Sequence, residues 1–261
     1  MRLRLTKTTL LVLLIFISSY VLFMLQQLPA RTVVGWLPPQ SLQGGAIQLN
    51  GVSGTLWQGQ VAQLRLNGLS VSNLSWQLQG WPLLWGDIAL GFRFRQSDAS
   101  GAGRLNTDIA GEQLLLSAVQ GRFPAAQLMP LFYGFPIVLA GEVNAVIEQA
   151  TLSKGQQLSL QGELLWREAA LTAPQHIPLG DVQVKMQARE QGTILTVQDQ
   201  GGPLELQGQI SLEGDGTYQT TLAVSARPAA SPALAQSISI LGQRDAQGRV
   251  QILQRGKLPN W

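Results

Sequence analysis

Hydrophobic and polar residues alternate along most of the chain after residue 45. A β-strand points successive side chains to opposite faces, so this alternation is typical of strands with one face in a core and the other in water. Three runs show it most clearly, and their polar positions are mainly Gln, Lys, Glu, Thr or Ser. The runs are 182–188, 204–213 and 218–226, and weaker alternation covers 61–66, 71–78, 88–95, 137–149 and 158–166.

Glycines interrupt the alternating runs and supply the backbone conformations that tight hairpins need. The spacing predicts about 12–14 strands, and their polar faces favour antiparallel pairing. The expected fold is mainly β, with an antiparallel, strongly curved sheet or a sandwich that follows one N-terminal transmembrane helix. One or two short helices are also expected, over 124–133, which begins with proline, and over 231–241, where Ser231 is the cap.

An uncharged apolar run extends from Thr8 to Leu25, and residues 26–28 lengthen it to about 21 residues. A helix of this length reaches across the ~30 Å core of a bilayer. A cleaved signal peptide is the alternative, but its apolar region would be only ~7–15 residues, and residues 28–30 lack the small-residue cleavage pattern. We therefore predict an uncleaved anchor, whose apolar side chains include Leu10, Leu11, Leu13, Leu14, Ile15, Phe16 and Phe23.

Basic residues flank this run on its N-terminal side, where Arg2, Arg4 and Lys7 stand. The positive-inside rule places them in the cytoplasm and everything after the run across the membrane. The predicted organisation is a cytoplasmic tail (1–7), the anchor (8–28), a juxtamembrane connector (29–44) and an exported β domain (45–261). The tripeptide Leu-Gln-Gly occurs four times, at 42–44, 78–80, 160–162 and 206–208, and the middle two copies are followed by a Leu-Leu-Trp that ends at Trp85 or Trp166. This repetition leaves open whether the domain consists of two continuous halves dividing near 136.

The amino-acid composition excludes several kinds of catalytic and binding site. The chain has no cysteine and one histidine, which excludes disulfides, thiolate metal sites and a cysteine nucleophile. His176 lies between two prolines, and no nucleophile elbow, phosphate loop or dinucleotide fingerprint is present. We therefore expect no catalytic residue, no metal and no cofactor. Only 13% of the residues are charged, and the basic residues do not cluster as nucleic-acid binding requires, so no nucleic-acid partner is expected.

Tryptophan is unevenly distributed, because five of the seven tryptophans precede residue 86. Trp76 alternates with leucine and is therefore expected in the core. The segment from Trp81 to Gly86 breaks the period of two and carries four large apolar residues in six. It is either a corner of the core or a surface patch that contacts a protein or a membrane.

A set of glycine and tryptophan motifs follows the apolar run in a fixed order. The set begins with Gly-Val-Ser-Gly-Thr-Leu-Trp-Gln-Gly at 51–59, continues through Trp-Pro-Leu-Leu-Trp-Gly at 81–86, and ends with Gly-Gly-Pro-Leu-Glu-Leu-Gln-Gly at 201–208. Over nearly its whole length the chain resembles the type II secretion system protein N family. The residues that carry the resemblance are Gly51, Gly54, Trp57, Gly59, Trp76, Trp81, Trp85, Gly201, Gly202, Pro203 and Gly208.

The resemblance implies a non-enzymatic bacterial inner-membrane protein with a single span and most of its mass in the periplasm. It would support the export of folded proteins across the outer membrane through contacts with the inner-membrane platform, the pseudopilus or secretin-associated proteins. A one-sided sheet could instead bury its apolar face around acyl chains. A periplasmic β protein that handles lipid or another hydrophobic ligand is therefore the alternative.

Overall fold

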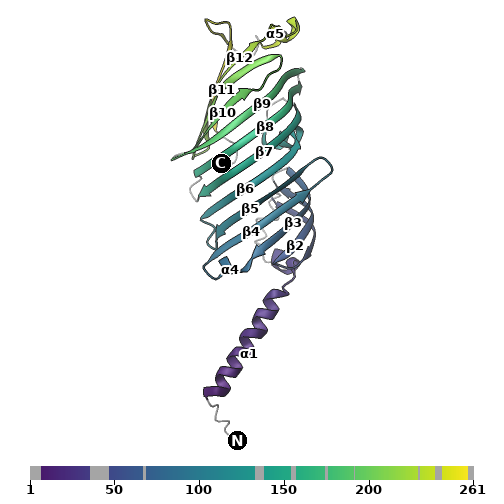
Figure 1. Ribbon diagram of the computed structural model, residues 1–261, viewed down its shortest axis with the longest axis vertical. Helices are drawn as coiled ribbons and strands as arrows, with labels where there is room; N and C mark the ends of the chain where they lie inside the picture. The colour runs from purple at the N-terminus through teal and green to yellow at the C-terminus, as the bar shows by residue number, and fades with distance from the viewer. Residues whose placement is uncertain are drawn as a thin grey trace.

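The computed structural model describes residues 7–35, 47–66, 69–132, 138–153, 157–173, 176–190, 192–228, 230–238 and 243–257. These residues form one 14-stranded antiparallel sheet in which each strand from β1 to β12 pairs with the next along the chain, followed by β14 and then β13 (Figure 1). The strands are β1 (Ile47–Gly54), β2 (Gln58–Leu66), β3 (Leu69–Gln79), β4 (Asp87–Arg95), β5 (Ser100–Asp108), β6 (Gln113–Pro124), β7 (Val138–Ser153), β8 (Gln157–Ala173), β9 (Ile177–Arg189), β10 (Gly192–Asp199), β11 (Leu204–Glu213), β12 (Thr217–Ala226), β13 (Gln243–Arg244) and β14 (Val250–Lys257).

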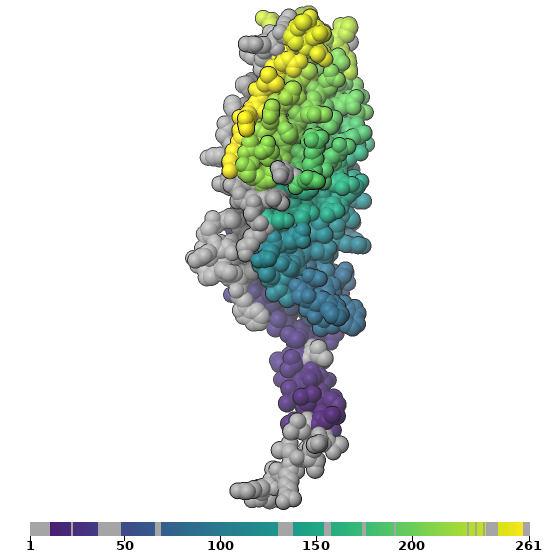
Figure 2. Space-filling model, turned by 90° about the vertical axis from the view of Figure 1, so that its left-hand side faces the viewer, coloured from purple at the N-terminus to yellow at the C-terminus, as the bar shows by residue number. Residues whose placement is uncertain are grey.

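The prediction of a mainly β, antiparallel fold is confirmed, but the expectation of a sandwich is wrong for the described residues. Strands that follow one another in the chain pair edge to edge from β1 to β12, and all the strands of the described residues belong to one sheet, with no second sheet packed on it. The expected strong curvature is also absent, because the sheet twists along its length without curling up on itself (Figure 1). Figure 2 shows the resulting elongated body, with α1 projecting from the end that holds the first strands.

Helical segments are short apart from the first. They are α1 (Lys7–Gln26), α2 (Ala30–Val34), α4 (Gly80–Leu83), the 3₁₀ helix η1 (Ala125–Phe132) and α5 (Pro232–Ile238). The two short helices predicted from proline and serine signals correspond to η1 and α5. The Ser231 hydroxyl accepts a hydrogen bond from the Leu234 amide at 3.3 Å, which is the expected N-terminal cap.

The run predicted as an anchor coincides with α1, whose apolar side chains are exposed around its circumference. Within the described residues, no helix is both long and apolar enough to cross a membrane. Arg2 and Arg4 lie outside the described residues, as do the side chains of Lys7 and Leu10. The described anchor side chains are Leu11, Leu13, Leu14, Ile15, Phe16 and Phe23, each at least half exposed.

One face of the sheet is apolar from end to end, and short helical segments pack on it at three places. Helix α2 brings Ala30 against the β1–β2 hairpin, η1 brings Ala125 against β7, and α5 brings Leu234 and Ile238 against β9–β12. Each of these segments comes just before or just after, in the order of elements along the chain, a strand of the region that it covers. The buried residues therefore form three apolar clusters along one sheet face, and Trp166 and Leu171 pack against both the η1 cluster and the α5 cluster.

Aromatic rings on the apolar face lie over glycines of the neighbouring strand. The Trp76 ring covers Gly59, and two phenylalanines of β4 cover glycines of β5, with Phe92 over Gly103. A β-carbon at Gly59 would collide with the Trp76 ring and would lie 2.8 Å from the Ser53 carbonyl oxygen. The missing side chain thus makes room for the ring, which shields the bare backbone from water.

We predict that Gly59→Ala lowers the free energy of unfolding by about 1–3 kcal/mol, because the added methyl group displaces an indole and meets fixed backbone. Gly91→Ala is the matched control, since its β-carbon would meet nothing closer than the Gln77 carbonyl oxygen at 3.8 Å. Urea unfolding of the detergent-solubilised chain, followed by tryptophan fluorescence, measures both. Equal stability of the two variants would contradict the packing of Trp76 on Gly59.

Candidate functional site

The glycine and tryptophan motif at 51–59 forms the joint between α1 and the sheet. The β1–β2 turn meets the end of α1 through two hydrogen bonds, from the Trp57 indole N–H to the Leu25 carbonyl (2.8 Å) and from the Leu56 amide to the Leu28 carbonyl (2.9 Å). The Arg31 side chain of α2 donates to the Val52 carbonyl at 2.7 Å. These contacts fix the direction in which α1 leaves the sheet.

Glycines give this turn its shape. Gly51 and Gly54 have φ of +70° and +90°, which residues with a β-carbon rarely adopt. A β-carbon at Gly54 would also lie 2.6 Å from the Gln58 carbonyl oxygen. The Trp76 indole N–H donates to the Leu56 carbonyl at 3.0 Å and holds the turn from β3. The motif that the sequence singled out at 51–59 is therefore a structural joint.

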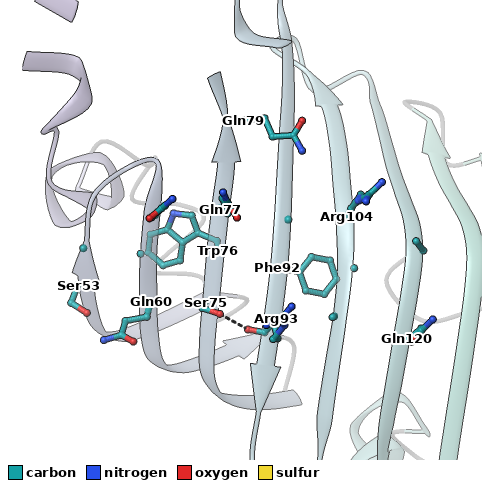
Figure 3. Close-up of a pocket in the computed structure, with 17 residues that line it drawn as sticks. Ser53, Gln60, Ser75, Trp76, Gln77, Gln79, Phe92, Arg93, Arg104 and Gln120 are labelled. Atoms are coloured by element: carbon teal, nitrogen blue, oxygen red, sulfur yellow. Dashed lines mark hydrogen bonds between the residues drawn. The ribbon is translucent and has the colours of Figure 1, made fainter. Parts of the chain in front are cut away.

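A groove of about 960 Å³ lies across β1–β6 beside this joint (Figure 3). Its lining comes mainly from the polar face of the sheet, where strand register aligns serine and glutamine on adjacent strands. The Ser75 hydroxyl donates to the Arg93 carbonyl at 3.1 Å, which links β3 to β4 within the groove. The labelled polar side chains are Ser53, Gln60, Ser75, Gln77, Gln79, Arg93, Arg104 and Gln120.

The groove is positively charged. Arg93 and Arg104 are both exposed, and neither guanidinium forms an ion pair with another described residue. No aspartate or glutamate is among the lining residues, and the described residues contain no group of side chains able to hold a metal ion. His176 is exposed just before β9 and is not part of the lining. This arrangement favours hydrogen bonds to carbonyl or carboxylate groups of a bound chain.

The segment from Trp81 to Trp85 lies on the surface. Helix α4 begins at the end of β3, and the side chains of Trp81 and Trp85 are 77% and 83% exposed. Of the two interpretations of this segment, the surface patch is the one that the structure supports. The break in alternation marks the place where the chain leaves the sheet, so the side chains after it have no opposing layer to cover them.

The Gly-Gly-Pro motif at 201–208 lies toward the other end of the sheet, in the β10–β11 turn and the start of β11. The buried Asp199 carboxylate accepts hydrogen bonds from the Gly201 and Leu206 amides (3.1 and 2.8 Å) and forms an ion pair with Arg227 at 2.6 Å. Gly201 and Gly202 have φ of +106° and +130°, and Pro203 and Gly208 continue into β11. This motif is separated from the groove by several strands.

Sequence reasoning found the motif glycines but missed Asp199, Arg227 and the two groove arginines. Each of these residues stands near an ordinary turn or on an ordinary polar strand position. Asp199 and Arg227 are 28 residues apart in the chain and meet only in the folded sheet, and Arg93 and Arg104 come to lie on one face through the pairing of β4 with β5. No local signal in the sequence would have identified them.

Residues 45–253 match the family described as type II secretion system (T2SS), protein N. The chain belongs to the type II secretion system protein N family. It is 30% identical over 251 residues to the type II secretion system protein N of Aeromonas hydrophila, which covers 94% of this chain and 96% of that protein. Identity to the protein N of Vibrio cholerae is 29% over 240 residues (88% and 91%), and to that of Klebsiella pneumoniae 26% over 246 residues (91% of each). No solved structure matches the chain.

Family membership makes this chain a structural component of type II secretion and not an enzyme. The family match spans the β1–β2 joint, the groove, the Trp81–Trp85 segment and the Gly201–Gly208 motif. The predicted family, the predicted part in protein transport by type II secretion and the predicted non-enzymatic role are therefore confirmed.

The Asp199–Arg227 contact makes stability depend on pH. Burial raises the pKa of the Asp199 carboxyl, but hydrogen bonds from the Leu206 amide, Arg227 and the Gly201 amide outweigh burial and hold the pKa below its ordinary value of 3.8. A lowered folded-state pKa adds stability that is present above about pH 4 and is lost as the pH falls through the folded-state pKa.

We predict that Asp199→Asn lowers the free energy of unfolding at pH 7 by about 2 kcal/mol, because it removes charge-assisted hydrogen bonds. The deficit shrinks below about pH 4, where the native carboxylate also becomes protonated. Urea unfolding at several pH values measures it. Glu190→Gln, at an exposed carboxylate at the end of β9, serves as the control and should change stability by less than about 0.5 kcal/mol. A deficit independent of pH would contradict the role of the charge.

Proposed function

We propose that this family member is a single-pass bacterial inner-membrane protein whose periplasmic sheet supports export of folded proteins across the outer membrane by protein–protein contacts. Residues 1–7 lie in the cytoplasm, residues 8–28 form the anchor, and residues 29–44 connect it to the β domain. The partners are other type II secretion components, among the inner-membrane platform, the pseudopilus and secretin-associated proteins. The observation that carries the contact role is the positively charged groove beside the anchor joint.

The anchoring proposal is supported by the surroundings of α1. A helix that packed on the sheet would bury one stripe of side chains. Here Leu14, Ile15 and Phe16 are 62%, 58% and 70% exposed, and consecutive residues of an α-helix point in directions about 100° apart. The basic residues before α1 and the absence of any acidic residue before Asp87 favour a cytoplasmic N-terminus.

The contact proposal is supported by the chemistry of the groove. Its serine, glutamine and arginine side chains offer many hydrogen-bond donors, and its two arginines lack acidic partners among the described residues. An extended polar or acidic segment of a partner fits this lining. Acyl chains would meet amides and guanidinium groups there, so the groove does not favour the hydrophobic-ligand alternative.

We predict that Phe16→Arg weakens retention of the chain in membranes, because a charge at the centre of a membrane helix costs about 2.5–3.5 kcal/mol. Alkaline carbonate washing of membranes from cells that express the variant measures the released fraction. Leu253→Arg, at a side chain of β14 that is 73% exposed, is the control and should leave retention unchanged. Equal retention of all three proteins would count against an anchor made by α1.

We predict that the double variant Arg93→Ala/Arg104→Ala reduces secretion several-fold, with exoproteins accumulating in the periplasm, because the groove loses both positive charges. Its fold should be unaffected, since both side chains are exposed. Arg255→Ala, at an exposed position on the polar face of β14, is the matched control. Normal secretion by the double variant at normal protein level would rule out the groove as the contact site.

A further inference from the structure

Four apolar side chains are exposed together at the end of the sheet where the β3–β4 and β5–β6 turns meet. Trp81, Leu84 and Trp85 come from the first turn and Ile109 from the second, with exposed fractions of 77%, 69%, 83% and 66%. We call these four residues the tryptophan patch. The Ile109 amide donates to the Gly86 carbonyl at 3.0 Å, so the two turns are held against each other.

The backbone under the patch is ordered by local hydrogen bonds. The Leu84 amide donates to the Trp81 carbonyl (3.1 Å) and the Trp85 amide to the Pro82 carbonyl (2.9 Å). Pro82 restricts the backbone of this turn further. The turn is thus held in a shape that keeps two indoles outside the core, although burying them would be favourable. An external apolar environment would stabilise this arrangement by taking the two indoles out of water.

The patch is connected to the end of α1 through Trp57. The indole N–H of Trp57 donates to the carbonyl of Leu25 in the last turns of α1. Its carbonyl accepts from the Leu78 amide at 2.8 Å, and its ring would lie 3.4 Å from a β-carbon at Gly80, the first residue of α4. Figure 1 shows the same relation, with α4 and the upper end of α1 at one end of the sheet.

Aromatic side chains with a polar N–H partition into the headgroup region of a bilayer, where the ring is in an apolar medium and the N–H remains hydrogen-bonded. If α1 spans the membrane, its C-terminal end marks the level of that region on the periplasmic side. The patch lies beside that end. Two acidic residues flank it, Asp87 at the start of β4 and Asp108 at the end of β5, so attraction to anionic lipid does not contribute.

We propose that the tryptophan patch inserts into the periplasmic leaflet of the inner membrane and gives the β domain a second attachment to the bilayer. This inference rests on the proposed anchoring by α1. Attachment at two points fixes the tilt of the sheet relative to the membrane. It places the β1–β6 groove near the bilayer surface and the β12–β14 end away from it.

The absence of cysteine allows a direct test, because one introduced cysteine can be labelled uniquely. The full-length chain is reconstituted in phosphatidylcholine nanodiscs and carries a nitroxide at Leu84→Cys, Phe16→Cys or Leu253→Cys. Electron paramagnetic resonance then compares collisions with oxygen, which concentrates in lipid, with those of a water-soluble nickel chelate. Leu253 is the matched exposed position on β14, and Trp85→Cys is a second position within the patch.

The expected result is high oxygen and low nickel accessibility at Phe16 and Leu84, and the reverse at Leu253, with no change when anionic lipid or salt is added. A lipid signal at Phe16 together with an aqueous signal at Leu84 and Trp85 overturns the inference and leaves the anchor standing. An aqueous signal at Phe16 overturns the anchor and the inference together. A patch label shielded from both reagents shows contact with protein and also overturns the inference.

Discussion

The apolar face of a single-layer sheet has to be kept from water, and the rest of this structure depends on how that is done. The described part of the chain has no second sheet, so the strands rely on short helical segments that each adjoin, in sequence, the region they cover. Helix α2 precedes β1, η1 lies between β6 and β7, and α5 follows β12. Because cover is local, the sheet can extend over fourteen strands without closing.

Glycine residues also help to shield the apolar face of the sheet from water. On the apolar face a large ring also lies across a glycine of the next strand, as Trp76 does over Gly59 and Tyr218 over Gly256. The ring buries the exposed backbone and its own face at once. The residues that carry the family resemblance at 51–59 are thereby explained by packing and turn geometry. They shape the joint between α1 and the sheet.

The polar face of the sheet has no helix packed on it among the described residues, and it is therefore accessible. The polar face of β1–β6 remains open, and its serine, glutamine and arginine side chains form a broad groove next to the point where α1 attaches. A structural secretion component needs a stable shape and accessible surface, and both follow from a sheet that is stabilised from one side only. The hydrogen bond from the Trp57 indole to the Leu25 carbonyl connects the end of α1 to the hairpin that borders this groove.

Period-two alternation determined the strands, because the face to which a side chain points is a local property of extended backbone. The sequence likewise contained the Ser231 cap of α5 and the apolar run of α1. Whether the apolar faces would meet in a sandwich or lie under helices was decided only by tertiary structure. The same holds for the exposure of Trp81 and Trp85 and for the Asp199–Arg227 contact, since strand register and layer number are set by interactions between residues far apart in the chain.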